Sequence, residues 1–137
     1  MPHFAKAALE RALPAQGVAY MHMPELGGLR KPRSDSINLG WRNEGFRGYA
    51  DYMQTDEFWR AVERLEDLAR EHRLAIMCAE AVPWRCHRSL ISDALTVRGD
   101  EVRHVTGRGA PVAHSLTPFA RVEDRRISYP PPDTLPL

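Results

Sequence analysis

The sequence predicts a single α/β domain built on a mainly parallel sheet with helices on both faces. Two apolar runs carry this prediction, Val18–Met23 and Leu74–Cys78, because each is short enough for a buried strand. Helical patterns lie before and after the second run, and strands that alternate with helices are typical of parallel sheets. The 137 residues are the length of one domain, and 43% hydrophobic and 27% charged residues are ordinary values for a globular protein.

The N-terminal half is expected to contain a helix, the first strand, a long loop and a short helix. His3–Leu13 has a helical pattern that residues 14–17, with Pro14 and Gly17, are expected to stop. Residues 25–33 form the loop after the first strand, and its two adjacent glycines allow close backbone approach or a positive φ. Residues 34–44 lack periodicity and predict an ordered loop, before a short helix at Gly48–Met53.

The best-marked helix begins after Thr55. This residue is a good N-cap, and Asp56 and Glu57 suit the positive end of the helix dipole. The helix is expected to run to about Arg70 and to bury Phe58, Val62, Leu65 and Leu68. A second helix is expected from about Cys86, since apolar residues recur there at three-to-four spacing, at Leu90, Ile91, Ala94 and Leu95.

The last third of the chain is expected to add short strands and a tail. Glu101–Thr106 alternates and predicts a strand that places Val102 and His104 on one face. Residues 130–137 are rich in proline and predict an extended tail of polyproline type, so the domain is expected to span residues 1–129. A short edge strand is expected just before the tail, at Ile127 and Tyr129.

Residues 74–95 concentrate the reactive side chains of the chain. Both cysteines lie there, Cys78 at the end of the predicted strand and Cys86 at the start of the predicted helix. A helix start offers unpaired N–H groups, and Arg85 and Arg88 add positive charge, so the expected ligand is an anion such as phosphate or carboxylate. Ligands of α/β sheets bind beyond the carboxyl ends of strands. The loop after the first strand is therefore expected to join the site, with Glu25, Gly27, Gly28, Arg30 and Arg33.

The same positive environment would favour the thiolate form of Cys86. We therefore predict Cys86 as the nucleophile and His87 as general base or proton donor. Glu80 would orient His87 or act as the base itself. Cys78, at a buried strand end, is expected to be packed beside the site. The predicted function is a thiol-dependent enzyme, or a former enzyme, with a small phosphate-bearing or nucleotide ligand.

Two other interpretations stay open. A module without catalysis would bind nucleic acid or a nucleotide through the basic residues, which are Arg30, Lys31, Arg33, Arg85 and Arg88. A metal-binding domain would use Cys78, Cys86 and His87, although their spacing differs from that of a Cys-x-x-Cys knuckle. The net charge of +1 gives no overall bias toward nucleic acid or an anionic membrane.

The remaining composition restricts the class of protein. No apolar run approaches the roughly 20 residues that span a bilayer, and the first residues lack a signal-peptide pattern. Two cysteines do not make a secreted disulfide scaffold, so we expect a cytoplasmic protein without a membrane partner. No motif calls for a cofactor.

Three segments resemble the DUF488 family, whose function is unknown: Pro24–Gly28 (PELGG), Gly48–Met53 (GYADYM) and, above all, Cys78-Ala-Glu80 with Cys86-His-Arg-Ser89. The resemblance covers about residues 2–129 and implies a compact α/β domain without implying a reaction. It implies one shared set of positions for the site, namely Glu25, Gly27, Gly28, Cys78, Glu80, Cys86, His87 and Arg88.

The chain departs from the family pattern at its start. Members usually carry a strand, a helix and an arginine-bearing strand before a segment like Pro2-His3-Phe4, with which this chain opens. About one strand-helix-strand unit is therefore expected to be missing. An exposed sheet edge would follow, and it predicts a homodimer formed by strand pairing.

Overall fold

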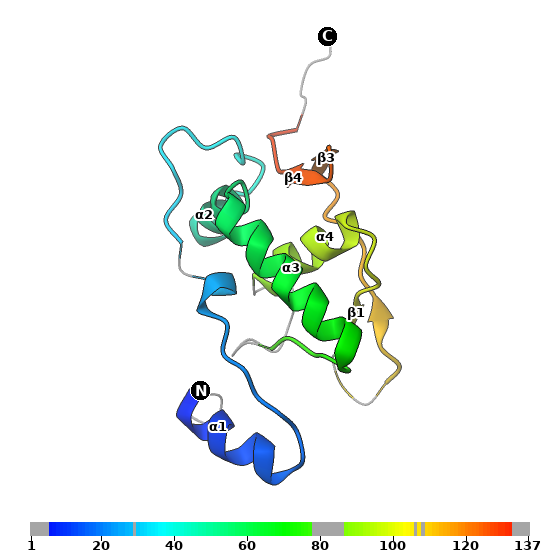
Figure 1. Cartoon of the computed structure of the whole chain (residues 1–137). Coiled ribbons are helices and arrows are strands. Elements are labelled where there is room, and N and C mark those ends of the chain that lie inside the picture. Colours follow the sequence, from blue (N-terminus) through cyan, green and yellow to red (C-terminus); the bar gives the residue numbers. More distant parts are fainter. Residues whose placement is uncertain (1–5, 29, 78–86, 106, 108, 133–137) are drawn as a thin grey trace.

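The structure is a computed structural model that describes residues 6–28, 30–77, 87–105, 107 and 109–132 (Figure 1). Within these residues it contains four α-helices, one 3-10 turn and four short strands. The elements are α1 (Lys6–Ala15), η2 (Pro24–Leu26), α2 (Glu44–Tyr52), α3 (Asp56–Glu71), α4 (Arg88–Val97), β1 (Arg103–His104), β2 (Val112–Ala113), β3 (Arg121–Glu123) and β4 (Arg126–Ser128).

The predicted α/β fold with a mainly parallel sheet is wrong. The described strands form two small antiparallel sheets, β1 with β2 and β3 with β4. Residues 18–23 and 74–77, which we predicted as buried strands, form no ladder with any described residue. Their apolar side chains are also not buried, since Met21 is 56% and Met77 46% exposed. A short apolar run does not by itself identify a strand, because it needs a hydrogen-bonded neighbour to become one.

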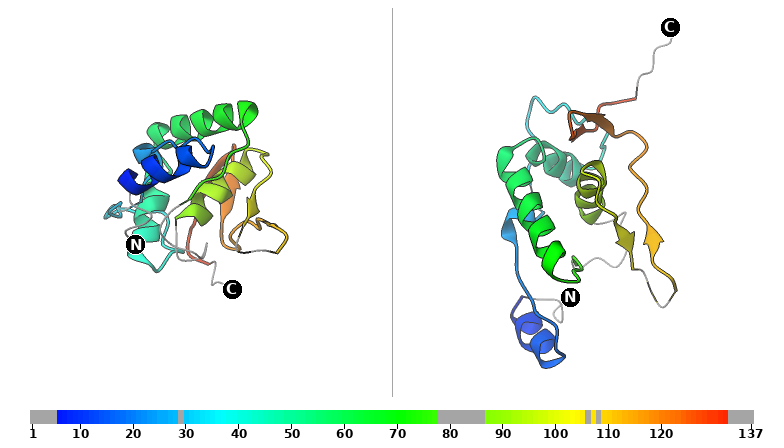
Figure 2. Two further views of the ribbon diagram at one scale, coloured as in Figure 1. Left: turned by 90° about the horizontal axis from the view of Figure 1, so that it is seen from below. Right: turned by 45° about the vertical axis from the view of Figure 1, so that its right-hand side comes forward.

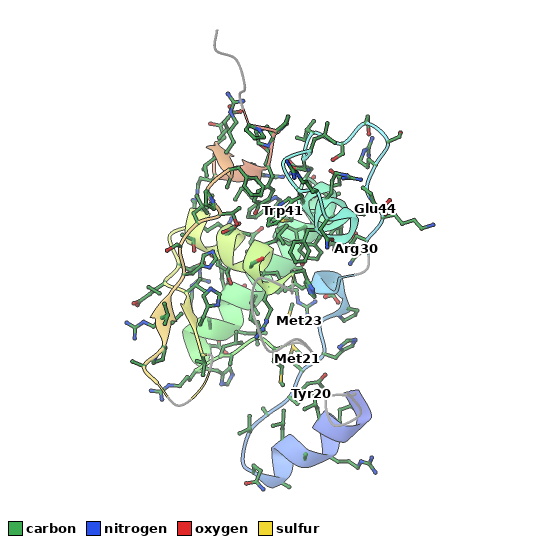
Figure 3. All side chains as sticks on the ribbon, turned by 180° about the vertical axis from the view of Figure 1, so that it is seen from behind. Tyr20, Met21, Met23, Arg30, Trp41 and Glu44 are labelled. Atoms are coloured by element: carbon green, nitrogen blue, oxygen red, sulfur yellow. The ribbon has the colours of Figure 1, made fainter. Side chains whose placement is uncertain are left out.

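Residues 18–23 instead link α1 to η2 as an irregular segment, and α1 lies apart from the other helices (Figures 1 and 2). Figure 3 shows the side chains of Tyr20, Met21 and Met23 on this segment, and that of Met23 packs against the core. The first helix includes Pro14, which we expected to end it. The homodimer expected from strand pairing stays a prediction. In the part of the chain that the structure describes, no helix has the length and apolar character needed to cross a bilayer.

The prediction of α3 is confirmed. The hydroxyl of Thr55 accepts a hydrogen bond from the backbone N–H of Phe58 at 3.2 Å and caps the helix. The helix buries Phe58, Val62 and Leu65, whereas Leu68 is only half-buried. It packs against η2 and α4, and thereby supports both segments that form the candidate site described below.

Helix α2, which we predicted to begin at Gly48, begins earlier. Asn43 caps it by accepting a hydrogen bond from the N–H of Phe46 at 3.0 Å. Gly48 lies where α2 crosses the backbone of residues 30 and 31. A Cβ atom at this position would lie 1.9 Å from the carbonyl oxygen of Arg30. Glycine therefore permits the close approach that places Arg30 beside the helix.

The apolar core lies between α2, α3, α4 and β4 (Figure 2). Leu90 and Ala94 of α4 are fully buried, and Tyr129 of the C-terminal segment belongs to the same buried cluster. The ring of Tyr129 belongs to an aromatic group with Trp41, Phe46 and Phe119. Its backbone N–H donates to Oδ1 of the buried Asn38 at 2.8 Å, which fastens the C-terminal segment to the long loop before α2.

The two hairpins agree in part with the sequence. β1 pairs His104 with Val112 and Arg103 with Ala113, so the predicted strand at 101–106 exists but is short. The expected alternation is confirmed, since Val102 and His104 are half-buried while Arg103 is exposed. The short strand expected near Ile127 is also confirmed as β4. These hairpins bring residues from the last third of the chain onto α4.

Candidate anion site at the start of α4

His87 is the N-cap residue of α4 and lies against both Tyr49 and Gly28. Its ring centroid is 4.8 Å from that of Tyr49. On another side it meets the backbone of Gly28, where a Cβ atom would lie 3.0 Å from Nδ1 of His87. Burial lowers the pKa of His87, and the positive charges of Arg88 and Arg30 lower it further, while a hydrogen bond with the backbone of Leu26 acts in the opposite direction. His87 is therefore held in its neutral form near neutral pH.

Arg30 is fixed beside this histidine by groups that carry no charge. Its Nε donates to the carbonyl of Gly27 at 3.2 Å, and Nη2 donates to the carbonyl of Pro24 at 3.3 Å. The guanidinium carbon lies 3.7 Å from the ring centroid of Tyr52, which gives a cation–π contact. No carboxylate among the described residues forms an ion pair with Arg30. Its charge is thus fixed in position by uncharged groups.

The 3-10 turn that carries these carbonyl groups is fastened to two helices. The hydroxyl of Tyr49 donates to the carbonyl of Leu26 at 2.8 Å, and that of Tyr52 donates to the carbonyl of Glu25 at 2.5 Å. The carboxylate of Glu25 forms an ion pair with Arg64 of α3. Glu25, which we placed in the site, therefore helps to anchor the turn, and its own charge is compensated by Arg64.

The predicted glycine pair behaves as a site of close approach. Neither Gly27 nor Gly28 has a positive φ. A Cβ atom at position 27 would lie 3.1 Å from the carbonyl oxygen of Pro24, and one at position 28 would touch the ring of His87. The two glycines thus let the turn fold tightly and let His87 approach the backbone.

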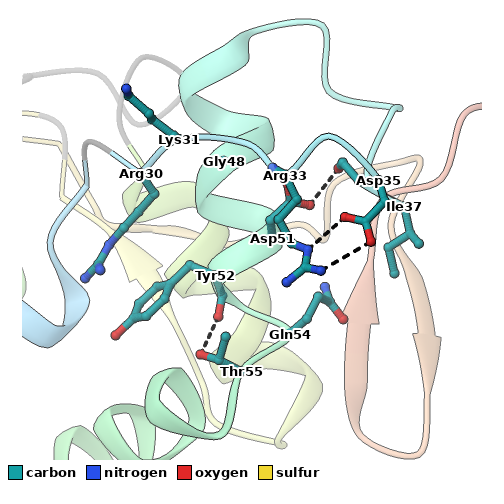
Figure 4. A pocket seen from close by; sticks show the side chains of 11 residues that line it. Arg30, Lys31, Arg33, Asp35, Ile37, Gly48, Asp51, Tyr52, Gln54 and Thr55 are labelled. Atoms are coloured by element: carbon teal, nitrogen blue, oxygen red, sulfur yellow. Dashed lines mark hydrogen bonds and ion pairs between the residues drawn. The ribbon is translucent and has the colours of Figure 1, made fainter.

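A pocket of about 600 Å³ adjoins Arg30 and Tyr52 on the side of α2 (Figure 4). Arg33 lines it, but Nε and Nη2 of this residue pair with the carboxylate of Asp35 at 2.9 and 3.2 Å. That pairing raises the pKa of Arg33 and lowers that of Asp35. Figure 4 shows the two side chains pointing toward one another, while Lys31 extends away from Tyr52. Arg33 is therefore paired with a carboxylate, whereas Arg30 has no such partner among the described residues.

The structure brings together part of the predicted site. Gly27, Gly28, Arg30 and His87 are neighbours, and the charge of Arg88 acts on His87. Arg33 belongs to the adjacent pocket instead. Four further predicted residues, Cys78, Glu80, Arg85 and Cys86, lie outside the described residues. No group of three or more metal-binding side chains occurs within the described ranges.

A comparison with protein families matches residues 1–95 to a family described as "Domain of unknown function DUF488". The chain belongs to the DUF488 family. The match confirms the resemblance seen in the sequence, and it includes η2, α2, α3 and most of α4. Comparisons with curated proteins and with solved structures gave no significant match.

A second polar cluster on α4, partly beyond the DUF488 match, escaped the sequence reasoning. Asp93 is fully buried and contacts His114, which in turn contacts His104, with both atom pairs 2.7 Å apart. Two signals could have found it. The first signal is Asp93, which lies on the apolar face of its helix, three residues after Leu90. The second is the pair of histidines, because His104 and His114 lie on either side of the turn that joins two paired strands.

Proposed function

We propose that the start of α4 binds a small phosphate-bearing anion and that this site activates Cys86 as a thiol nucleophile. The observation that carries the proposal is the guanidinium of Arg30, which is held by two carbonyl groups and an aromatic ring without a carboxylate partner among the described residues. A fixed and uncompensated guanidinium is the usual partner of a phosphate or carboxylate group.

The chemistry expected of such a site follows from its charges. Cys86 directly precedes His87 in the sequence, and positive charge at a helix start favours a thiolate. His87 has a lowered pKa and is neutral near pH 7, so it is able to accept the proton that the thiol releases. A bound phosphate would compensate the positive charges of Arg30 and Arg88. It would therefore raise the pKa of the Cys86 thiol and that of His87.

The test is the alkylation of Cys86 by iodoacetamide as a function of pH, in a Cys78→Ala background that leaves one thiol. We expect a thiol pKa below the ordinary value of about 8.5 and slower alkylation at pH 7 when inorganic phosphate is added. Arg30→Gln should raise the thiol pKa and remove most of the response to phosphate. Arg33→Gln is the matched control, because this arginine lines the adjacent pocket and its Nε and Nη2 atoms already pair with Asp35.

Ordinary alkylation kinetics that do not respond to phosphate would remove the basis of the proposal. Unchanged behaviour of Arg30→Gln would also contradict it, because that variant removes the charge on which the site depends.

The second candidate is nucleic-acid or nucleotide binding without catalysis. It is supported by the pocket beside α2, which is lined by Arg30, Lys31 and Arg33. Phosphate contacts would make such binding steeply dependent on salt. Fluorescence polarisation with labelled single-stranded and double-stranded oligonucleotides tests it, and the absence of binding at low salt would exclude it.

A further inference from the structure

We propose that His104, His114 and Asp93, which we call the histidine cluster, form an acid-sensitive contact that holds strand β1 on helix α4 and opens when both imidazole rings are charged. The inference goes beyond the proposed function, because neither an anion nor Cys86 takes part in it. It follows from the hydrogen bonds, the burial and the chain positions of the cluster itself.

The histidine cluster joins the β1–β2 hairpin to the middle of α4. His104 belongs to β1 and His114 directly follows β2, whereas Asp93 belongs to α4. Nε2 of His114 lies 2.7 Å from Oδ1 of Asp93, and Nδ1 of the same ring lies 2.7 Å from Nε2 of His104. The side chains of His114 and Asp93 are only 6% and 0% exposed. Their polar atoms are therefore satisfied by protein groups and not by water.

The carboxylate of Asp93 fixes the direction of these hydrogen bonds. Its Oδ2 accepts from the hydroxyls of Thr117 and Tyr129, both at 2.7 Å, and its Oδ1 accepts from the backbone N–H of Thr117 at 3.1 Å. Because a carboxylate only accepts, Nε2 of His114 carries a proton and donates it to Asp93. When both rings are neutral, Nδ1 of His114 therefore accepts, and Nε2 of His104 donates.

The neutral pair is able to take up one proton without the loss of a hydrogen bond. The new proton binds Nδ1 of the half-buried His104, and the proton on Nε2 of His104 passes to Nδ1 of His114. His114 then carries the positive charge and still donates to Asp93, while His104 is neutral and accepts at Nε2. The charge lies beside the buried carboxylate, which compensates it.

A second proton does not fit the closed cluster. It would bind Nε2 of His104, and this atom would then face the N–H of Nδ1 of His114 at a distance of 2.7 Å. Two donors form no hydrogen bond with one another, and the two charged rings repel. Asp93 compensates only one of the two charges, so the rings must separate.

The ring of His104 provides much of the hold on β1. The strand has two residues, and its ladder pairs Arg103 with Ala113 and His104 with Val112. Among these four residues only His104 is half-buried, and the other three are exposed. Separation of the rings would therefore release β1 from α4. The helix that carries the candidate site at its start would lose part of its support in acid.

The charges around His104 oppose the second proton. Burial lowers the pKa of His104, and His114 and Arg88 lower it further, while Asp93 raises it. The contact should therefore be complete above the ordinary histidine pKa of about 6.5 and should be lost as the pH falls below it.

The other titratable neighbours do not supply a second anion. Burial and the adjacent Asp93 raise the pKa of Tyr129, so its hydroxyl stays protonated. Glu101 pairs with Arg103 at 2.6 Å on the exposed face of the strand region. Within the described part of the chain, Asp93 is thus the carboxylate that is hydrogen-bonded to the ring pair.

The experiment is a pH titration of the full chain by NMR with 15N-labelled histidines, from about pH 8 to about pH 4.5, which brackets the ordinary histidine pKa of about 6.5. The ring nitrogen shifts report protonation. The NOE between the rings of His104 and His114, whose centroids are 4.9 Å apart, reports the contact. We expect the first proton to leave this NOE intact and the second to abolish it. The protection factor of the His114 amide, which donates to the carbonyl of Val102 at 2.9 Å, should fall roughly tenfold in the same step.

Two results of this titration would overturn the inference. In one, both rings become charged while the NOE and the protection of the His114 amide persist. In the other, the amides of Leu90 and Ala94 in α4 lose protection in the same step, which would show global unfolding in place of a local release.

His114→Gln separates an acid-sensitive contact from an ordinary structural one. Glutamine is able to accept from Nε2 of His104 and to donate to Asp93, but it takes up no proton. His104 should then become charged at a higher pH than in the second step of the wild type, because no positive neighbour opposes it. Amide protection at position 114 should persist in acid. An acid release that is unchanged in this variant would overturn the role of the ring pair.

His104→Gln is the second variant and decides the question if His114→Gln does not fold. Its amide is able to turn over and accept from the charged ring of His114, so β1 should again stay in place in acid. His22→Gln is the matched control, because His22 is exposed, and it should behave like the wild type. No arm of this experiment contains phosphate or monitors Cys86, so its outcome is independent of the proposed function.

Discussion

The imidazole of His87 packs directly on the backbone of Gly28, so closely that a Cβ atom at position 28 would lie 3.0 Å from Nδ1 and 3.2 Å from Cε1. This contact joins the loop after η2 to the start of α4. It makes the position of the histidine depend on the absence of a side chain at a residue that is 59 positions earlier in the chain (87 minus 28).

Gly28→Ala should therefore displace the ring of His87 without unfolding the protein. We expect an altered pKa of His87 and weaker sensitivity of Cys86 alkylation to phosphate, because the ring can no longer hold its place beside Arg30. Histidine NMR and alkylation rates measure both effects. Gly107→Ala is the control, since a Cβ atom there would meet nothing within 4 Å; equal effects of the two substitutions would contradict the prediction.

Gly48→Ala should be the most disruptive small substitution near the site. The added methyl group would overlap the carbonyl oxygen of Arg30 at 1.9 Å, so the backbone of residues 30 and 31 or helix α2 must move. We expect a loss of about 1–3 kcal/mol in the free energy of unfolding, as for other overpacked sites. Urea denaturation measures it. Gly45→Ala in the same helix is the control, because its Cβ would meet only the side chain of Asn43.

Asp51 holds the loop that lines the pocket. Its carboxylate accepts hydrogen bonds from the backbone N–H of Arg33, the hydroxyl of Ser36 and the amide of Asn38, at 2.8, 2.6 and 2.8 Å. Asp51→Ala leaves these donors without their acceptor and should cost about 3 kcal/mol. Hydrogen exchange should become faster at residues 33–38. Asp35→Ala is the comparison, since its pair with Arg33 is exposed to solvent and contributes little to stability.

The histidine at the start of α4 should make the protein less stable in mild acid. Its folded-state pKa lies below the ordinary value of 6.5. The unfolded chain therefore takes up more protons as the pH falls below 6.5, and the stability decreases through that window and is level above it. His104 contributes in the same direction. Denaturation at a series of pH values should show a smaller decrease for His87→Gln, whereas substitution of the exposed His22 should retain the full decrease.

A carboxylate pair at the other end of α4 should act with the opposite sign. Burial and the neighbouring Glu66 raise the pKa of Asp100 from 3.8 to about 6. Its contribution to stability is complete below 3.8 and is lost as the pH rises through about 6. Asp100→Asn mimics the protonated form, so it should be more stable than the wild type at pH 7 and equal to it near pH 4. An unchanged difference between the two pH values would contradict this prediction.

The sequence predicted the helices better than the sheet. The start of α3 follows from one hydrogen bond of Thr55 to a residue three positions later, and such local signals are readable in a chain. Whether residues 18–23 or 74–77 pair depends on distant partners that no local pattern reveals. The apolar runs were read correctly as apolar, but the strands inferred from them were wrong.

The candidate site also combines residues that the local sequence indicates with contacts that only the fold determines. The glycine pair and His87 were predicted from residue type and position. The role of Arg30 was not fully predictable, because it depends on the carbonyl of Pro24 and the ring of Tyr52, which the fold places beside it. Arg33 seemed equivalent to Arg30 in sequence, yet it pairs with Asp35, only two residues away, whereas Arg30 has no carboxylate partner among the described residues.

The position of Tyr129 has a practical consequence for anyone who isolates the domain. The family match stops at residue 95, yet this tyrosine reaches Asn38 in one direction and Asp93 in the other. A fragment trimmed to the family boundary would lack that cross-link and also β4, which packs on α4, so we expect part of the apolar face of α4 to become exposed. Such a fragment should aggregate on expression, while one that continues to residue 132 should stay in solution.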